Sequence, residues 1–241
     1  MHGGLGSKQE HLTVSAAASL KETLEEIEPL YRHHTSSTTI TYNFGGSGTL
    51  EQQVEQGAPV DVFISASPRE VEALALKGLL VEESRKDLVK NEVVLVVPRD
   101  SKLVIGFGDL MNSDVKRIAI GDPEAVPAGQ YAKEVLTHLR IFEGLQPKLI
   151  LTRDVRQALA YASMGNVDAA VVYETDARVA TQVKVVAVAP PGSHEPIVYP
   201  VAAVKTQHSP AAAMGFVQFL LGAEAQAVFA KHGFIPAGSG T

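Results

Sequence analysis

Short apolar runs alternate with helical patterns along the first part of the chain. Three such pairs follow one another: Leu12–Val14 with Leu20–Tyr31, Thr39–Phe44 with Thr49–Glu55, and Val60–Ser65 with Pro68–Lys77. Regular alternation of strand and helix is typical of a parallel sheet covered by helices. The pattern therefore predicts an α/β protein with a parallel-type sheet.

The third predicted helix carries clear signals at both of its ends. Ser67 is a good N-cap, Pro68 suits the first helical position, and Glu70 is placed to close a capping box. Gly78 follows the last apolar position, where a glycine commonly ends a helix. We expect this helix to begin and end at these residues.

A second alternating set follows, between two long apolar strands. The long strands are Glu92–Pro98 and Ile197–Val204, and each is a candidate crossing between two lobes. The other expected elements are strands at Arg117–Gly121, Leu149–Leu151 and Asp168–Tyr173, and helices from Ala128, from Val155, at Pro210–Leu221 and at Ala223–His232. Two crossings imply two lobes with a cleft, and ligands of open α/β sheets bind beyond the carboxyl ends of strands.

Composition and charge narrow the possible partners. The 241 residues carry a formal net charge of −6, so the clustered basic surface that nucleic-acid binding requires is not expected. An acidic protein also repels anions at long range, so an anion site here would depend on local dipoles. The sequence has no cysteine, which excludes disulfides, thiolate metal sites and a cysteine nucleophile.

No apolar run approaches the ~20 residues that span a bilayer. The opening segment Met1–Glu10 also lacks the apolar region of a secretory signal. We expect that a signal peptide has been removed and that the mature protein starts near His11.

The segment from Gly121 to Lys133 is the most informative part of the sequence. It joins an apolar strand to a helix through a loop that contains Pro123 and Pro127. Strand, proline-containing loop and helix start is an arrangement that points backbone N–H groups at an anion.

This segment and four others together resemble the molybdate-binding proteins of ABC importers, which have the type II periplasmic-binding-protein fold. The other four are Ala16–Leu20, Gly46–Leu50, Asp154–Leu159 and Val171–Tyr173. The five motifs occur in the family's order, and the resemblance extends from about Leu12 to Ile235. It implies a lobe I of residues 11–91 and 202–241 and a lobe II of residues 92–201.

The resemblance also implies a function. It implies a periplasmic protein that binds molybdate and also tungstate by closing its lobes over the tetrahedral dianion. The protein is expected to work as a monomer and to deliver the anion to the membrane permease of an ABC importer. No catalysis, cofactor or nucleic acid is expected. The metal enters as its oxyanion, so no side chain is expected to ligate a metal directly.

Two serines are candidate ligands of the anion. Ser19 begins a capping-box pattern with Glu22, so it fits a helix N-cap as well as an anion contact. Ser47 lies in a glycine-rich turn, which is not a Walker A loop because no lysine follows the last glycine. The family's matching serines contact the oxyanion, and the resemblance implies the same for Ser19 and Ser47.

Two backbone amides and a tyrosine complete the implied site. Ala128 and Val155 fit ordinary helix starts, and Asp154 with Gln157 predicts an N-cap just before Val155. Tyr173 ends an apolar strand and fits a tyrosine at the edge of the core. The resemblance implies that the Ala128 and Val155 amides and the Tyr173 hydroxyl donate to the oxyanion.

Two alternatives remain open. A sulfate-type oxyanion binder would share this fold and differ mainly in cavity size. A serine hydrolase is the alternative from another class, because Gly45 and Ser47 between a strand and a helix resemble a nucleophile elbow, with His208 or His232 downstream. Thr49 stands where that elbow has its final glycine.

Overall fold

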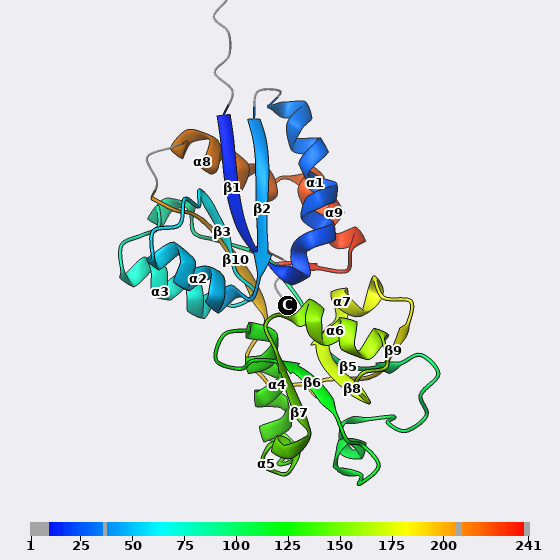
Figure 1. Cartoon of the computed structure of the whole chain (residues 1–241). Helices are drawn as coiled ribbons and strands as arrows, with labels where there is room; N and C mark the ends of the chain where they lie inside the picture. Colours follow the sequence, from blue (N-terminus) through cyan, green and yellow to red (C-terminus); the bar gives the residue numbers. More distant parts are fainter. Residues whose placement is uncertain (1–9, 36–37, 206–208, 239–241) are drawn as a thin grey trace, which may run out of the picture.

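The chain forms two lobes, each built around its own sheet (Figure 1). This computed structural model describes residues 10–35, 38–205 and 209–238. The segment before the expected mature start near His11, and the candidate His208, lie outside the described residues. We call the six-stranded sheet with its helices lobe I and the five-stranded sheet with its helices lobe II.

The sheet of lobe I is mixed. The first three strands along the chain are parallel, as their alternation with helices predicts, but β10 lies antiparallel between β3 and β4. The chain enters this strand from lobe II, and the short edge strand Ile235–Pro236 is also antiparallel to β4. In spatial order the strands are β11 (Ile235–Pro236), β4 (Lys86–Lys90), β10 (Val198–Ala203), β3 (Val62–Ile64), β1 (Glu10–Ala17) and β2 (Thr38–Gly45).

Helices cover this sheet, and those expected from the sequence are confirmed in place. Figure 1 shows α1 and α9 side by side on one flank and α2 and α3 on the other. The helices of lobe I are α1 (Lys21–His34), α2 (Ser47–Glu55), α3 (Pro68–Leu76), α8 (Pro210–Leu220) and α9 (Ala223–Lys231), with 3-10 turns η1 (Ala18–Leu20) and η2 (Glu82–Ser84).

Lobe II has the same mixed character. Its strands β6, β7 and β8 are parallel, and β5 runs antiparallel to both β8 and β9. In spatial order the strands are β7 (Leu149–Thr152), β6 (Ile118–Gly121), β8 (Ala169–Tyr173), β5 (Val93–Pro98) and β9 (Val183–Val188). The helices are α4 (Pro127–His138), α5 (Phe142–Leu145), α6 (Val155–Ser163) and α7 (Glu174–Arg178), with 3-10 turns η3 (Phe107–Met111) and η4 (Gln146–Lys148).

The chain crosses between the lobes twice. The first crossing is at Asn91 and Glu92, between β4 and β5, and the second is the segment 189–197 between β9 and β10. The two long apolar strands therefore begin just after the crossings, and each pairs within a single lobe. All of β10 pairs in lobe I, so the boundary after Val201 that the resemblance implies would fall within this strand. The lobe limits stay a prediction.

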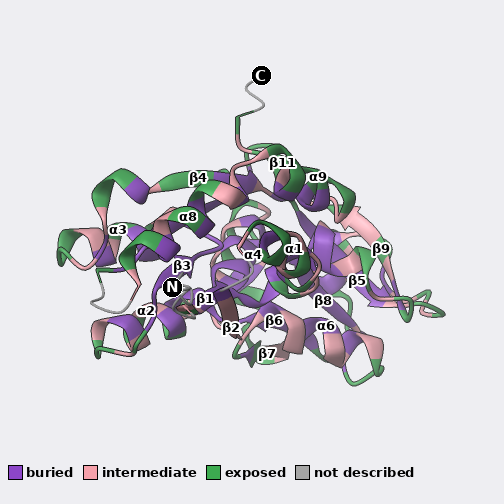
Figure 2. Ribbon diagram, turned by 90° about the horizontal axis from the view of Figure 1, so that it is seen from above, coloured by how far each residue is buried: buried purple, intermediate pink, exposed green. Residues whose placement is uncertain are grey.

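Buried residues concentrate on the central strands, and the helices turn exposed faces outward (Figure 2). In the described residues no single helix is long and apolar enough to cross a bilayer. The pair α8 and α9 reaches that length and composition together, but the two helices are bent by 57°. Phe216 and Phe229 from these helices are fully buried.

The third helix confirms most of its predicted end signals. Ser67 accepts from the Arg69 amide, Pro68 is the first helical residue, and Gly78 has a φ of 68°. The expected capping box is wrong. The Glu70 carboxylate accepts from the hydroxyls of Ser67 (2.5 Å) and Ser65 (3.0 Å) instead of the Ser67 amide, which donates to the Ser65 hydroxyl.

Candidate functional site

A small cavity between the lobes brings all five predicted site residues together. Its volume is about 10 Å³, close to the minimum that holds one water molecule. β1, β2 and β8 each end at a residue that lines it, so it lies beyond the carboxyl ends of strands. Lobe I contributes Ala17, Ala18, Ser19, Gly45, Gly46, Ser47 and Ala66, and lobe II contributes Val126, Pro127, Ala128, Val155 and Tyr173.

Three α-helices begin at this cavity. Ser47 is the first residue of α2, Ala128 the second residue of α4, and Val155 the first residue of α6. Amides in the first turn of a helix have no acceptor within the helix, and the helix dipole places partial positive charge there. The predicted N-cap of α6 is confirmed, because the Asp154 carboxylate accepts from the Gln157 amide at 2.8 Å.

Ser19 does not cap a helix, so the capping-box interpretation is wrong. Residues 18–20 form the turn η1, and α1 starts at Lys21 with no side-chain cap. Ser19 therefore lies within a helical turn instead of preceding one. Ser19 is 2% exposed, and its hydroxyl oxygen lies 3.0 Å from that of Tyr199.

A backbone amide of lobe I holds the Ser47 hydroxyl. The hydroxyl oxygen accepts from the Ala66 amide at 3.1 Å. An oxygen that accepts from the backbone keeps its own hydrogen for another acceptor. Ser47 can therefore donate into the cavity without losing this bond.

The Tyr173 hydroxyl is the most telling atom of the site. Tyr173 is 1% exposed, and its hydroxyl has no hydrogen-bond partner among the described residues. Burial raises the pKa of Tyr173 well above the usual value, so the phenol keeps its proton. A buried donor without an acceptor is costly, and this one lines the cavity where an acceptor would bind.

Among the described residues, no charged side chain of either sign lines the cavity. Asp122 and Glu124, in the loop before α4, are not among the lining residues. The cavity therefore offers donor hydroxyls and backbone amides with partial positive charge, and it lacks a carboxylate to accept a proton. This donor set suits an anion whose oxygens only accept hydrogen bonds.

The two lobes touch closely at the glycines of the Ser47 loop. The Gly48 amide donates to the Ala125 carbonyl of lobe II at 3.0 Å. A Cβ at Gly48 would lie 2.8 Å from that same oxygen, and a Cβ at Gly46 would lie 2.7 Å from the Arg153 carbonyl. These glycines let the backbones of the lobes meet, a role that the sequence alone did not reveal.

A partly buried ion-pair cluster also joins the lobes behind the cavity. Arg156, the residue after Val155, lies 2.8 Å from Asp176 and contacts Glu22 of lobe I. Burial raises the pKa of the Asp176 carboxyl to about 6, although the Arg156 charge opposes the rise. Sequence analysis missed this cluster because its members are far apart along the chain.

The geometry gives no support to a nucleophilic Ser47. No histidine of the described residues lines the cavity, and His208 lies outside them. His232, one of the two candidate bases, is 2.8 Å from Glu26.

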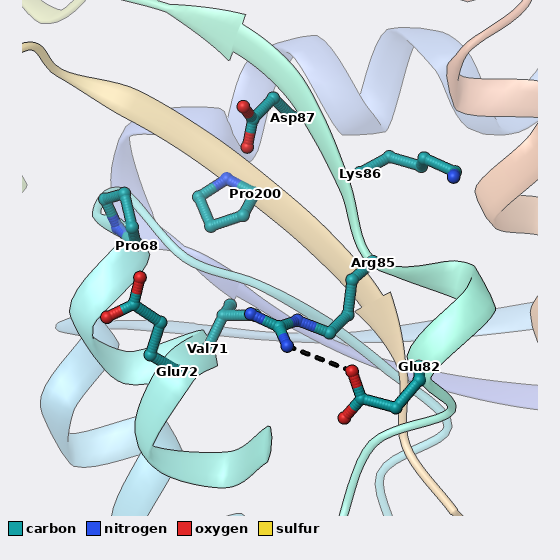
Figure 3. A pocket seen from close by; sticks show the side chains of 8 residues that line it. All are labelled: Pro68, Val71, Glu72, Glu82, Arg85, Lys86, Asp87 and Pro200. Carbon is teal, nitrogen blue, oxygen red and sulfur yellow. Dashed lines mark hydrogen bonds and ion pairs between the residues drawn. The ribbon is translucent and has the colours of Figure 1, made fainter. Parts of the chain in front are cut away.

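A second pocket lies on the outer side of lobe I, between α3, η2, β4 and β10 (Figure 3). Its volume is about 380 Å³. Both signs of charge line it, and Arg85 is already paired with Glu82 at 3.0 Å. A small dianion would meet three carboxylates there: Glu72, Glu82 and Asp87. The interlobe cavity is the better oxyanion site.

Two lobes that meet around a small cavity lined by hydroxyls and helix starts are typical of a solute-binding protein of the periplasmic-binding type. Residues 12–235 match the family described as bacterial extracellular solute-binding protein. This match covers most of the chain, and the protein belongs to that family.

Relatives and a solved structure agree with this assignment. The chain is 43% identical to the YvgL lipoprotein of Bacillus subtilis, assigned to ABC transporter substrate binding, over 94% of this chain and 87% of that one. It is 40% identical to the molybdate-binding protein ModA of Haemophilus influenzae over 92% and 89%. The periplasmic molybdate-binding protein of Azotobacter vinelandii superposes with a TM-score of 0.85 at 26% identity, covering 93% and 98%.

Proposed function

We propose that the protein binds molybdate in the interlobe cavity and delivers it to the membrane permease of an ABC importer. The buried, unpartnered hydroxyl of Tyr173 is the observation that carries the proposal, because it requires an acceptor inside the cavity. The names of the relatives support molybdate as that acceptor. Tungstate, a tetrahedral dianion of the same shape, is the second expected ligand.

The proposed ligands are the hydroxyls of Ser19, Ser47 and Tyr173 and the amides of Ala128 and Val155. Molybdate is an unprotonated dianion near neutral pH, so each of its oxygens can accept from these donors. Helix N-termini stabilise the negative charge without a cationic side chain. The net charge of −6 then matters little, because the attraction is local.

Lobe closure is the mechanism of capture. Ser19 and Ser47 come from lobe I, whereas Ala128, Val155 and Tyr173 come from lobe II. Only the closed form makes both sets of contacts, so bound anion shifts the population from open to closed. The permease would recognise this closed form.

The proposal extends to the setting of the protein. It acts in the periplasm as a monomer, without cofactor or catalysis. Its lobes follow the limits 11–91 with 202–241 and 92–201, except that Val198–Val201 go with the rest of β10 to lobe I. A fluorophosphonate probe tests the absence of catalysis, because an activated Ser47 would be labelled and a binding serine would not.

A thermal-shift panel of oxyanions tests the ligand. A ligand that binds only the folded state stabilises it by about 4 kcal/mol at a thousandfold excess over Kd. Molybdate and tungstate should therefore raise the Tm clearly, and sulfate at equal concentration should raise it much less. An equal shift with sulfate would favour the sulfate-type alternative.

A further inference from the structure

A chain of buried hydrogen bonds runs from the first interlobe crossing to the cavity. Asn91, at the crossing, donates through its amide nitrogen to the Tyr199 hydroxyl at 3.1 Å and to the Thr175 hydroxyl at 2.9 Å. The Tyr199 hydroxyl is 3.0 Å from that of Ser19, which lines the cavity. All four residues are buried.

The direction of the first bond is fixed by the backbone. The Asn91 side-chain oxygen accepts from the Glu92 amide at 2.9 Å. A backbone amide can only donate, so the atom facing it must be the carbonyl oxygen, and the NH₂ group must face Tyr199 and Thr175. Tyr199 therefore accepts from Asn91.

The direction of the bond between Tyr199 and Ser19 follows from the first. Tyr199 is 0% exposed, and burial raises its pKa far above the usual value, so it keeps its proton. Among the described residues Ser19 is the only further partner of this hydroxyl. A buried hydroxyl hydrogen without an acceptor is unfavourable, so Tyr199 donates to Ser19. The hydrogen of Ser19 is left for the cavity.

We propose that Asn91 and Tyr199 are positioning residues that fix the Ser19 hydroxyl as a donor to the ligand and so select unprotonated oxyanions. This inference rests on the proposed function. A free serine hydroxyl can donate or accept, and it could rotate to accept from a protonated anion. When Tyr199 donates to Ser19, the Ser19 hydrogen has no other acceptor among the described residues, so it points into the cavity. There it would face the proton of hydrogenphosphate, which is a repulsive arrangement.

The test compares molybdate with inorganic phosphate at pH 7. Molybdate affinity is measured by titration calorimetry, and phosphate affinity by competition against molybdate. The quantity of interest is the ratio of the two affinities. A general loss of packing lowers both affinities together and leaves the ratio unchanged, whereas release of Ser19 changes the ratio.

Tyr199→Phe removes the donor that occupies the Ser19 oxygen. Ser19 can then accept from hydrogenphosphate, so the molybdate-to-phosphate ratio should fall by about tenfold, the factor expected for one hydrogen bond. The matched control is Tyr31→Phe, which deletes another buried lobe I hydroxyl that donates to the Ala212 carbonyl, away from the cavity. Its ratio should equal that of the wild type.

Asn91→Asp reverses the chain. A carboxylate accepts where the amide donates, so the Tyr199 hydrogen turns toward residue 91 and Tyr199 accepts from Ser19. Molybdate then loses a donor. Its affinity should fall by about tenfold or more relative to wild type, and it should fall more than phosphate affinity does.

The outcomes are distinct. A wild-type protein that does not bind molybdate refutes the proposed function. If the wild type binds molybdate tightly and the molybdate-to-phosphate ratio is unchanged in both Tyr199→Phe and Asn91→Asp, the positioning role alone is overturned. Failure of phosphate to displace molybdate from either variant counts as an unchanged ratio. A lowered ratio in both variants, with the Tyr31→Phe ratio unchanged, supports the proposal.

Discussion

Replacing Tyr173 by phenylalanine should have opposite effects on binding and on stability. Tyr173 lines the cavity, and its buried hydroxyl has no acceptor among the described residues. A hydrogen bond to a charged group contributes about 1.5–3 kcal/mol. Tyr173→Phe should therefore weaken molybdate binding by about 10- to 150-fold, because each 1.4 kcal/mol is a factor of ten.

Without ligand, Tyr173→Phe should not lower the free energy of unfolding. In the closed form the wild-type hydroxyl is an unsatisfied buried group, and such a group costs roughly 1–3 kcal/mol. Removing it should leave the free energy of unfolding equal to or above that of the wild type. Titration calorimetry measures the affinity, and urea unfolding without ligand measures the stability.

Tyr42→Phe is the matched control. That hydroxyl donates to the Leu24 carbonyl at 3.3 Å, away from the cavity. Its loss should lower stability by about 1 kcal/mol and leave molybdate affinity unchanged. Wild-type affinity in Tyr173→Phe, or a clear loss of ligand-free stability in that variant, would refute the assignment of this hydroxyl to the ligand.

Three further substitutions test closure, the second serine and the buried carboxylate. Gly48→Ala should lower molybdate affinity by about tenfold or more, because the new Cβ would lie 2.8 Å from the Ala125 carbonyl oxygen of lobe II when the lobes are closed. Titration calorimetry measures the affinity, and Gly108→Ala is the control because a Cβ there would meet open space. Ser47→Ala should weaken binding by about 1.5–3 kcal/mol and also lower urea stability, because the Ala66 amide loses its acceptor. In the wild type, the Asp176 carboxyl should lower the free energy of unfolding by roughly 3 kcal/mol as the pH rises from about 4 to 6. Asp176→Asn should remove this part of the pH dependence.

The sign of the pH effect follows from the raised pKa of Asp176. Its folded-state pKa of about 6 exceeds the reference value of 3.8, so within that window the folded protein holds a proton that the unfolded chain has released. Its stabilising contribution is complete below the lower value and is lost as the pH rises through the higher one. Parallel curves of unfolding free energy against pH for wild type and Asp176→Asn would contradict the raised pKa of Asp176.

For Gly48→Ala, unchanged molybdate affinity would count against lobe closure. For Ser47→Ala, it would count against the role of Ser47 as a ligand.

Local sequence determined most of the elements. Apolar runs followed by amphipathic segments placed the helices, and Pro68, Gly78 and Asp154 marked helix ends correctly, because such signals act within a few residues. The polar strand β4 and the edge strand β11 gave no comparable signal. The antiparallel direction of β5 and β10 was also missed, because direction depends on where the chain enters each lobe.

The resemblance of five sequence motifs to a known family also pointed to five of the residues that line the cavity. Only the tertiary structure decided what surrounds them. Ser19 meets Tyr199 instead of capping a helix, and Arg156 joins Asp176 to Glu22 across the lobes. These partners are far apart along the chain, so no local pattern relates them. The close approach at Gly48 likewise exists only because two separately built sheets come together, and there the space for a side chain is set by the opposite lobe.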